Sequence, residues 1–185
     1  MSRNAVPGGL TVLLLLLAAC SSPGGPASAP ATAAASASAQ ASASASEAPA
    51  LALTSLDAEP IQEEQESVAL AFDRPSAGSL LKEVPADLDF GAYAVVCVFL
   101  GPRQTTGWSL DLRTASLAGD QLDIAARENA PRGTTRPEVT YPADCGLLTR
   151  AALPAGELVV RADDTITGEF IADTSVVVPE ASNLP

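Results

Sequence analysis

Thirty consecutive residues near the N-terminus, 21–50, consist almost entirely of Ser, Ala, Pro and Gly. Such a tract has no apolar face to bury, and its serine side chains compete for backbone hydrogen bonds, so it favours neither a helix nor a strand. Acidic residues then recur between Asp57 and Glu66, and like charges keep a chain solvated. We therefore assign residues 20–63 to a disordered linker, which leaves about 115 residues for a folded domain.

A short apolar segment precedes this linker. Residues 10–17 read Leu-Thr-Val-Leu-Leu-Leu-Leu-Leu, and Arg3 lies on their N-terminal side. The run is far shorter than the ~20 residues that span a bilayer, and it has the length and flanks of a signal peptide. Leu17-Ala18-Ala19-Cys20 resembles the lipobox of bacterial lipoproteins. The resemblance implies that residues 1–19 are removed, that Cys20 carries a lipid anchor, and that the domain lies in the bacterial cell envelope, outside the cytoplasm. The alternative is an ordinary secretory signal in which Cys20 is incidental.

The composition argues against several classes of function. The chain has 22 acidic and 10 basic residues, for a net charge of −12, so it repels nucleic-acid phosphates. It has no histidine, the commonest general base and the commonest metal ligand. Lys82 is the only lysine, and no serine lies in a motif that would pair with it. We read the carboxylates of Asp163 and Asp164 as solvated turn residues. We expect no catalytic residue, no metal site, no cofactor and no nucleic-acid partner.

Alternation of apolar and polar residues predicts β-strands along residues 64–178. The alternating apolar side chains are Val68, Leu70 and Phe72; Trp108, Leu110 and Leu112; and Leu122, Ile124 and Ala126. Residues 92–100 are apolar throughout, which is typical of a central strand covered on both faces, and 157–162 and 169–178 are two more β-rich runs. A short helix is predicted at 76–84, with Ser76 as its cap and Pro85 as its stop. The predicted fold is mainly β, a small antiparallel β-sandwich or curled sheet with one short helix, and 179–185 form a tail.

The predicted turn at Gly119-Asp120 raises a problem of register. A two-residue loop would pair Leu117 with Leu122 and would place Leu122 on the face opposite Leu110. A shift of one residue moves every side chain of a strand to the other face. We therefore predict an odd-length loop or a β-bulge near residues 117–121.

Two cysteines remain after Cys20, namely Cys97 and Cys145. Export would place them where disulfides can form, and a bridge would close a loop worth ~4 kcal/mol in the chain-entropy model. The alternative is two buried thiols in separate strands. Two cysteines without histidine do not make a zinc site.

Two polar segments rich in Gly and Pro are candidate recognition loops. The first, 101–108, contains Arg103, Gln104, Thr105, Thr106, Gly107 and Trp108. Trp108 offers the kind of surface that anchors protein interfaces, although it can equally lie in the core beside an ordinary hairpin connection. The second, 129–138, contains Arg132 and Arg136, which are unusual in so acidic a chain. We predict that these eight residues bind a partner.

The stretch from Asp89 to about Val160 resembles the C-terminal domain of the PrcB family, known from a subunit of a bacterial surface protease complex. The matching motifs are Asp89-Phe90, Ala94–Leu100, Gly101, Thr106-Gly107-Trp108, Cys145-Gly146-Leu147-Leu148-Thr149 and Leu158-Val159-Val160. Trp108 stands where tyrosine is more usual in the family. The resemblance implies a non-enzymatic lipoprotein that is an accessory subunit of a protease complex.

A second resemblance concerns Gln104-Thr105-Thr106-Gly107-Trp108, which is similar to the Thr-Thr-Gly-aromatic loop of chagasin-type cysteine-protease inhibitors. It implies protease inhibition as an alternative function. A third possibility is a structural envelope lipoprotein that binds cell-wall glycan through Trp108.

Overall fold

The structure is a computed structural model and describes residues 48–180. Its elements are β1 (Ala50–Leu51), β2 (Leu53–Ser55), β3 (Glu66–Ala71), α1 (Arg74–Ala77), β4 (Tyr93–Leu100), β5 (Ser109–Ala118), β6 (Gln121–Asn129), β7 (Ala143–Thr149), the 3₁₀ turn η1 (Arg150–Ala152), β8 (Gly156–Asp164) and β9 (Phe170–Val178). The mainly β fold with one short helix is as predicted. None of these helices is long and apolar enough to cross a membrane. The predicted lipidation site, Cys20, lies outside the described residues.

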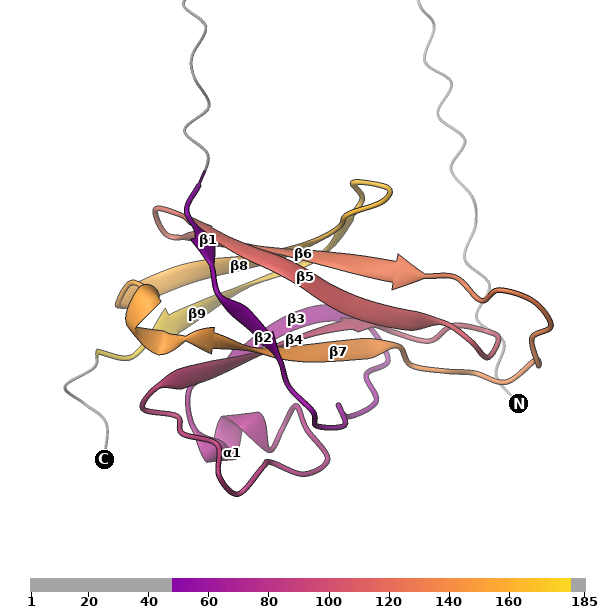
Figure 1. Cartoon of the computed structure of the whole chain (residues 1–185), viewed down its shortest axis with the longest axis horizontal. Coiled ribbons are helices and arrows are strands. Elements are labelled where there is room, and N and C mark those ends of the chain that lie inside the picture. The colour runs from indigo at the N-terminus through magenta and orange to yellow at the C-terminus, as the bar shows by residue number, and fades with distance from the viewer. Residues whose placement is uncertain (1–47, 181–185) are drawn as a thin grey trace, which may run out of the picture. The chain divides into compact units, whose positions relative to one another are not determined.

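Two sheets face each other in Figure 1, a five-stranded sheet of order β1-β5-β6-β8-β9 and a four-stranded sheet of order β2-β7-β4-β3. All pairs are antiparallel except β6 and β8, which run parallel. The sandwich is therefore mixed rather than antiparallel. The reason lies in the connection, because the chain leaves the first sheet after β6, forms β7 in the second sheet, and returns as β8 in the direction of β6.

Strand β4 supplies side chains to two hydrophobic cores. Ala94, Val96, Val98 and Leu100 face the other sheet and join the core between the layers. Val95, Cys97 and Phe99 face outward and pack under two segments on either side of β3, residues 56–61 and residues 74–90, the second of which carries α1 (Figure 1). This double covering accounts for the uninterrupted apolar run and confirms the prediction of a central strand.

The predicted disulfide joins β4 to β7. Cys97 lies directly opposite Cys145 in the antiparallel register, with a Cα–Cα distance of 4.2 Å. The two cysteines do lie in separate strands, as the alternative had it, but they are bonded. The bridge lies in the hydrophobic core on the outer side of the four-stranded sheet. We call this cluster the outer core, and it includes Ala71, Leu81 and Phe99.

The helix begins earlier than predicted and is shorter. It spans only Arg74–Ala77, and the side chain of Asp73 caps it by accepting a hydrogen bond from the Ser76 backbone N–H at 2.8 Å. Ser76 is therefore inside the helix and does not cap it. Aspartate is at least as good a cap as serine, and Pro75 fits the first turn, so the start at Asp73 is favoured over the one at Ser76.

The β5–β6 hairpin solves its register problem with a bulge in an unexpected place. The loop is the two-residue Gly119-Asp120, and Gly119 has a φ of 66°. The bulge lies at Arg113, because Leu112 pairs with Ala126 and Thr114 with Ala125. The prediction of a bulge was right, but its position near residues 117–121 was wrong. The shift at Arg113 brings Leu110 and Leu122 to the same core.

The bulge is held from the opposite sheet. The Asp144 carboxylate on β7 accepts hydrogen bonds from the backbone N–H of Leu112 at 2.7 Å and from that of Cys145 at 2.9 Å. Burial raises the pKa of Asp144, and these two hydrogen bonds offset only part of the rise.

The boundary of the predicted linker needs correction. Residues 50–55 form β1 and β2, which pair with β5 and β7 and so connect the two sheets; Figure 1 shows them as the indigo segment that crosses from one layer to the other. Leu51 and Leu53 pack against the inner core. The alternation in Leu51-Ala52-Leu53 covers only three residues and follows an Ala-rich tract, so it does not predict a strand. These residues form strands because they pair with β5 and β7.

Candidate functional site

The two predicted recognition loops lie against each other at one end of the sandwich. Arg103 and Thr140 exchange backbone hydrogen bonds of 2.8 and 2.9 Å. The Thr106 N–H donates to the Arg136 carbonyl at 3.1 Å, and the Arg136 N–H donates to the Thr106 hydroxyl at 3.1 Å. Two segments that are distant in the sequence therefore form one surface. We call it the loop surface, and it comprises residues 101–108 and 129–140.

The side chain of Arg103 is directed inward and is not available as a free contact. Its guanidinium donates to both oxygens of Glu128, at 2.7 and 3.3 Å, to the Leu100 carbonyl at 2.7 Å, and to Glu66 at 3.3 Å. Hydrogen bonding to Glu128 raises the pKa of Arg103 above its ordinary value. Arg103 thus joins the loop to β3, β4 and β6, and its role is to position the loop.

Trp108 is half-buried and lines an open cleft rather than the core. Its indole N–H donates to the Thr105 hydroxyl at 3.1 Å, and the Arg103 guanidinium carbon lies 5.9 Å from the ring. Gly107, with a φ of 91°, passes so close to the second loop that a Cβ there would lie 2.9 Å from the Cβ of Pro131. The glycine is therefore required for the two loops to touch.

The remaining predicted partner-binding residues are more accessible. Gln104, Arg132 and Arg136 are exposed, and neither arginine forms an ion pair within residues 48–180. The structure therefore brings all eight predicted residues to the loop surface, with Arg103 turned inward and the two other arginines on the outside.

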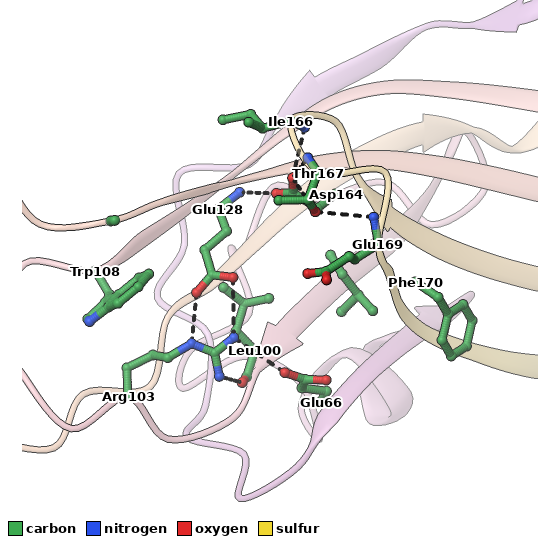
Figure 2. A pocket seen from close by; sticks show the side chains of 12 residues that line it. Glu66, Leu100, Arg103, Trp108, Glu128, Asp164, Ile166, Thr167, Glu169 and Phe170 are labelled. Atoms are coloured by element: carbon green, nitrogen blue, oxygen red, sulfur yellow. Dashed lines mark hydrogen bonds and ion pairs between the residues drawn. The ribbon is translucent and has the colours of Figure 1, made fainter.

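The cleft next to Trp108 has a volume of about 730 Å³ and is open to solvent. Figure 2 shows Trp108 on one side and Phe170 on the other, with the Arg103–Glu128 pair and Glu169 between them. The β8–β9 turn supplies the side of the cleft that the sequence analysis missed, including Ile166 and Phe170. A polar turn between two strands gave no signal of function in the sequence, and only the sheet order places it beside the loop surface.

Asp164 holds this turn in shape. Its carboxylate accepts hydrogen bonds from the backbone N–H groups of Glu128, Ile166 and Thr167 at 2.7–2.8 Å, and from the Thr167 hydroxyl at 3.2 Å. Burial alone would raise the pKa of Asp164, but the hydrogen bonds outweigh it and lower the pKa. The residue is only 7% exposed, so the interpretation of Asp164 as a solvated turn residue was wrong.

The cleft brings acidic and aromatic side chains together. Within residues 48–180 no three acidic, cysteine or histidine side chains gather as metal ligands. The cleft combines aromatic walls with four carboxylates, namely Glu66, Glu128, Asp164 and Glu169, and a single guanidinium.

Comparisons with known proteins identify no family. No family model matches the chain, and no solved structure matches it. Among curated proteins, the chain is similar to cytoplasmic tRNA 2-thiolation protein 1 of Bos taurus, with 32% identity over 108 residues. The match covers 56% of this chain and 30% of the bovine protein, so the chain spans less than a third of that relative.

Proposed function

We propose that this chain is a membrane-anchored, non-enzymatic lipoprotein whose β domain binds another envelope protein, as an accessory subunit of a surface protease complex. The observation that carries the proposal is the loop surface itself. Two polar loops are fixed against each other by the hydrogen bonds between Thr106 and Arg136, beside an open cleft. Preformed loops on a rigid β scaffold are typical of recognition, because little conformational entropy is lost on binding.

The details of the loop surface favour a protein as the ligand. Arg132 and Arg136 are exposed there, and arginine is enriched at protein interfaces. Trp108 contributes a large aromatic surface with its polar group already hydrogen-bonded to Thr105. The tRNA thiolation named for the bovine relative is not proposed for this chain, because a net charge of −12 opposes binding to an RNA backbone.

A second candidate function is inhibition of a protease. It is favoured by the way in which the Thr105-Thr106-Gly107-Trp108 segment is presented. Thr105 accepts a hydrogen bond from the Thr140 hydroxyl through its carbonyl, and Thr106 is bonded to Arg136, so the segment is held as a rigid ridge. A rigid ridge can enter the active-site cleft of a protease without first being ordered.

Crosslinked capture from host envelopes tests the proposal. The full chain, expressed with its own signal, is compared with Trp108→Ala and with the double variant Arg132→Gln/Arg136→Gln. The matched control is Arg113→Gln, an exposed arginine on the β5 bulge. We expect wild type and the control to capture a protease, and both loop-surface variants to lose it.

The activity of the captured protease separates the two candidates. An accessory subunit leaves the protease active or raises its activity, whereas an inhibitor lowers its turnover at an equimolar dose. Absence of any protease specific to wild type, or equal capture by all variants, would overturn the proposal. Sedimentation of the wild type with purified cell-wall sacculi in its place would favour the glycan-binding alternative.

A further inference from the structure

The four carboxylates of the cleft differ in the number of hydrogen bonds and ion pairs that they form. Arg103 binds Glu128 and Glu66, whereas Asp164 accepts three hydrogen bonds from the β8–β9 turn and one from the Glu128 backbone N–H on β6. Glu169 is exposed, and its carboxylate makes no hydrogen bond and no ion pair among residues 48–180. In Figure 2 this carboxylate lies between Phe170 and the Arg103–Glu128 pair. The cleft therefore contains three more negative charges than positive ones, and one of its carboxylates has no partner in the described structure.

Apolar surface surrounds this free carboxylate. Trp108 and Phe170 form opposite sides of the cleft, and the buried side chains of Leu100 and Ile171 line it as well. Phe170 is 51% exposed and Ile166 is 62% exposed, so both offer apolar surface at the cleft. The guanidinium of Arg161, which lies over the Phe170 ring, already forms a bidentate ion pair with Asp163.

Carboxylates combined with aromatic walls select a particular kind of side chain. Lysine and arginine place an apolar stem against hydrophobic surface and keep the charged group at its end. Aromatic faces attract such cations, as the Arg161 guanidinium over the Phe170 ring at 5.1 Å already illustrates. A net charge of −12 also steers basic partners toward the chain and repels acidic ones.

We propose that the cleft between Trp108 and Phe170 binds a lysine or arginine side chain of the partner protein, with Glu169 as the carboxylate that pairs with the cation. The inference rests on the proposed function and names the class of partner segment that the loop surface recognises, namely a basic one. The apolar stem of the basic side chain lies against the two aromatic rings, and the loop surface contacts the residues on either side of it.

Trp108 provides a direct readout, because it is the only tryptophan of the chain and lines the cleft. Purified full-length protein in detergent is titrated with pentalysine, with pentaarginine, with pentaglutamate and with a chitin trisaccharide, and the tryptophan emission is recorded. We expect a saturable change with the two basic peptides that weakens as salt is added, and no change with the other two ligands. No saturable change with either basic peptide, or an equal response to pentaglutamate or to the sugar, would overturn the inference.

Two pairs of variants locate the binding. Glu169→Gln removes the free carboxylate, and its control Glu157→Gln removes an exposed carboxylate at the far end of β8. Phe170→Ala removes one wall, and its control Val177→Ala shortens an apolar side chain that is 75% exposed near the other end of β9. We expect the Kd for pentalysine to rise about three- to tenfold in each cleft variant, as is usual for single charge and cation–π contacts, and to stay unchanged in each control. Unchanged affinity in both cleft variants contradicts the inference.

The capture experiment distinguishes this inference from the proposed function on which it rests. If Glu169→Gln and Phe170→Ala capture the protease as wild type does, while Trp108→Ala and the double arginine variant lose it, the loop surface binds the partner and the cleft does not take a basic side chain. If the cleft variants also lose the protease, and the peptide titration agrees, both proposals stand.

Discussion

Single residues at the site act mostly through hydrogen bonds that fix the backbone of the loops. Gly107 allows the two loops to touch, Arg103 ties one of them to three strands, and Asp164 holds the β8–β9 turn. These three residues act by holding the backbone and side chains around the cleft in place. Glu169 and Phe170, which we propose contact a partner, are instead exposed.

Asp164→Ala is expected to destabilise the protein more than any other carboxylate substitution near the site. The change leaves three backbone N–H groups without their acceptor, which costs about 2–4 kcal/mol in unfolding free energy, since hydrogen bonds to charged groups contribute more than neutral ones. Chemical denaturation monitored by circular dichroism measures this, with Asp163→Ala as the control. Equal stability of the two variants contradicts the assignment.

The effect of Asp164→Ala on the unfolding free energy is predicted to depend on pH. The pKa of Asp164 is lower in the folded state than in the unfolded chain, so its stabilisation is fully present above the unfolded value of about 3.9. It is lost as the pH falls through the folded pKa. The difference in unfolding free energy between wild type and Asp164→Ala is therefore constant near neutral pH and shrinks below about pH 4. A difference that grows on acidification would show that the folded pKa is raised.

At the scale of elements, a bulge in β5 and the parallel pairing of β6 with β8 determine which side chains reach the same core. The bulge at Arg113 turns one half of β5 so that Leu110 joins the same core as Ala115, and Asp144 of the opposite sheet accepts the N–H of Leu112 beside it. The parallel pairing of β6 and β8 likewise follows from the excursion of β7 into the other sheet. Both features place the ends of β5, β6 and β8 around the cleft.

Deletion of Arg113 tests the bulge. Removal of this residue restores an uninterrupted register and moves the N-terminal half of β5, including Leu110, to the opposite face. Loss of the buried Leu110 alone costs about 2–5 kcal/mol, so we expect a strongly destabilised or unfolded protein. Arg113→Ala keeps the bulge and should change the unfolding free energy by less than about 0.5 kcal/mol. Similar denaturation midpoints for the deletion and the substitution would contradict this account.

At the scale of the whole domain, the segment before Glu66 is part of the fold. Strands β1 and β2 pair with β5 and β7, and residues 56–61 cover the outer core, where the Leu56 N–H bonds to the Cys145 carbonyl at 3.1 Å. The disulfide between Cys97 and Cys145 lies in that outer core. The folded domain therefore includes residues 50–61.

Truncation measures this boundary. A chain that starts at residue 48 retains β1 and β2, whereas one that starts at residue 64 lacks both strands and also lacks Leu51, Leu53 and Ile61, which pack against the two cores. Each partly buried leucine or isoleucine contributes about 1–2 kcal/mol, so we expect the shorter chain to be less stable by several kcal/mol. Thermal unfolding of the two chains compares them, and equal melting temperatures would return residues 48–63 to the linker.

The sequence by itself determined the features that depend on local pattern. Alternation predicted most strands, the apolar run at 92–100 predicted a doubly covered strand, and the two cysteines predicted a bridge that the structure contains. Gly- and Pro-rich composition also marked both loops of the loop surface. These inferences succeed because side-chain periodicity and turn chemistry are properties of adjacent residues.

Only the tertiary structure decided the features that depend on partners distant in the chain. Residues 50–55 form strands because they pair with β5 and β7. The bulge lies at Arg113 because a shift there lets Leu110 and Leu122 reach the same core. The cleft is formed by residues from β3 to β9, and no local pattern shows that Glu169 and Phe170 meet Trp108 there. Sheet order sets these contacts, and it follows from the packing of the whole domain rather than from the propensity of any segment.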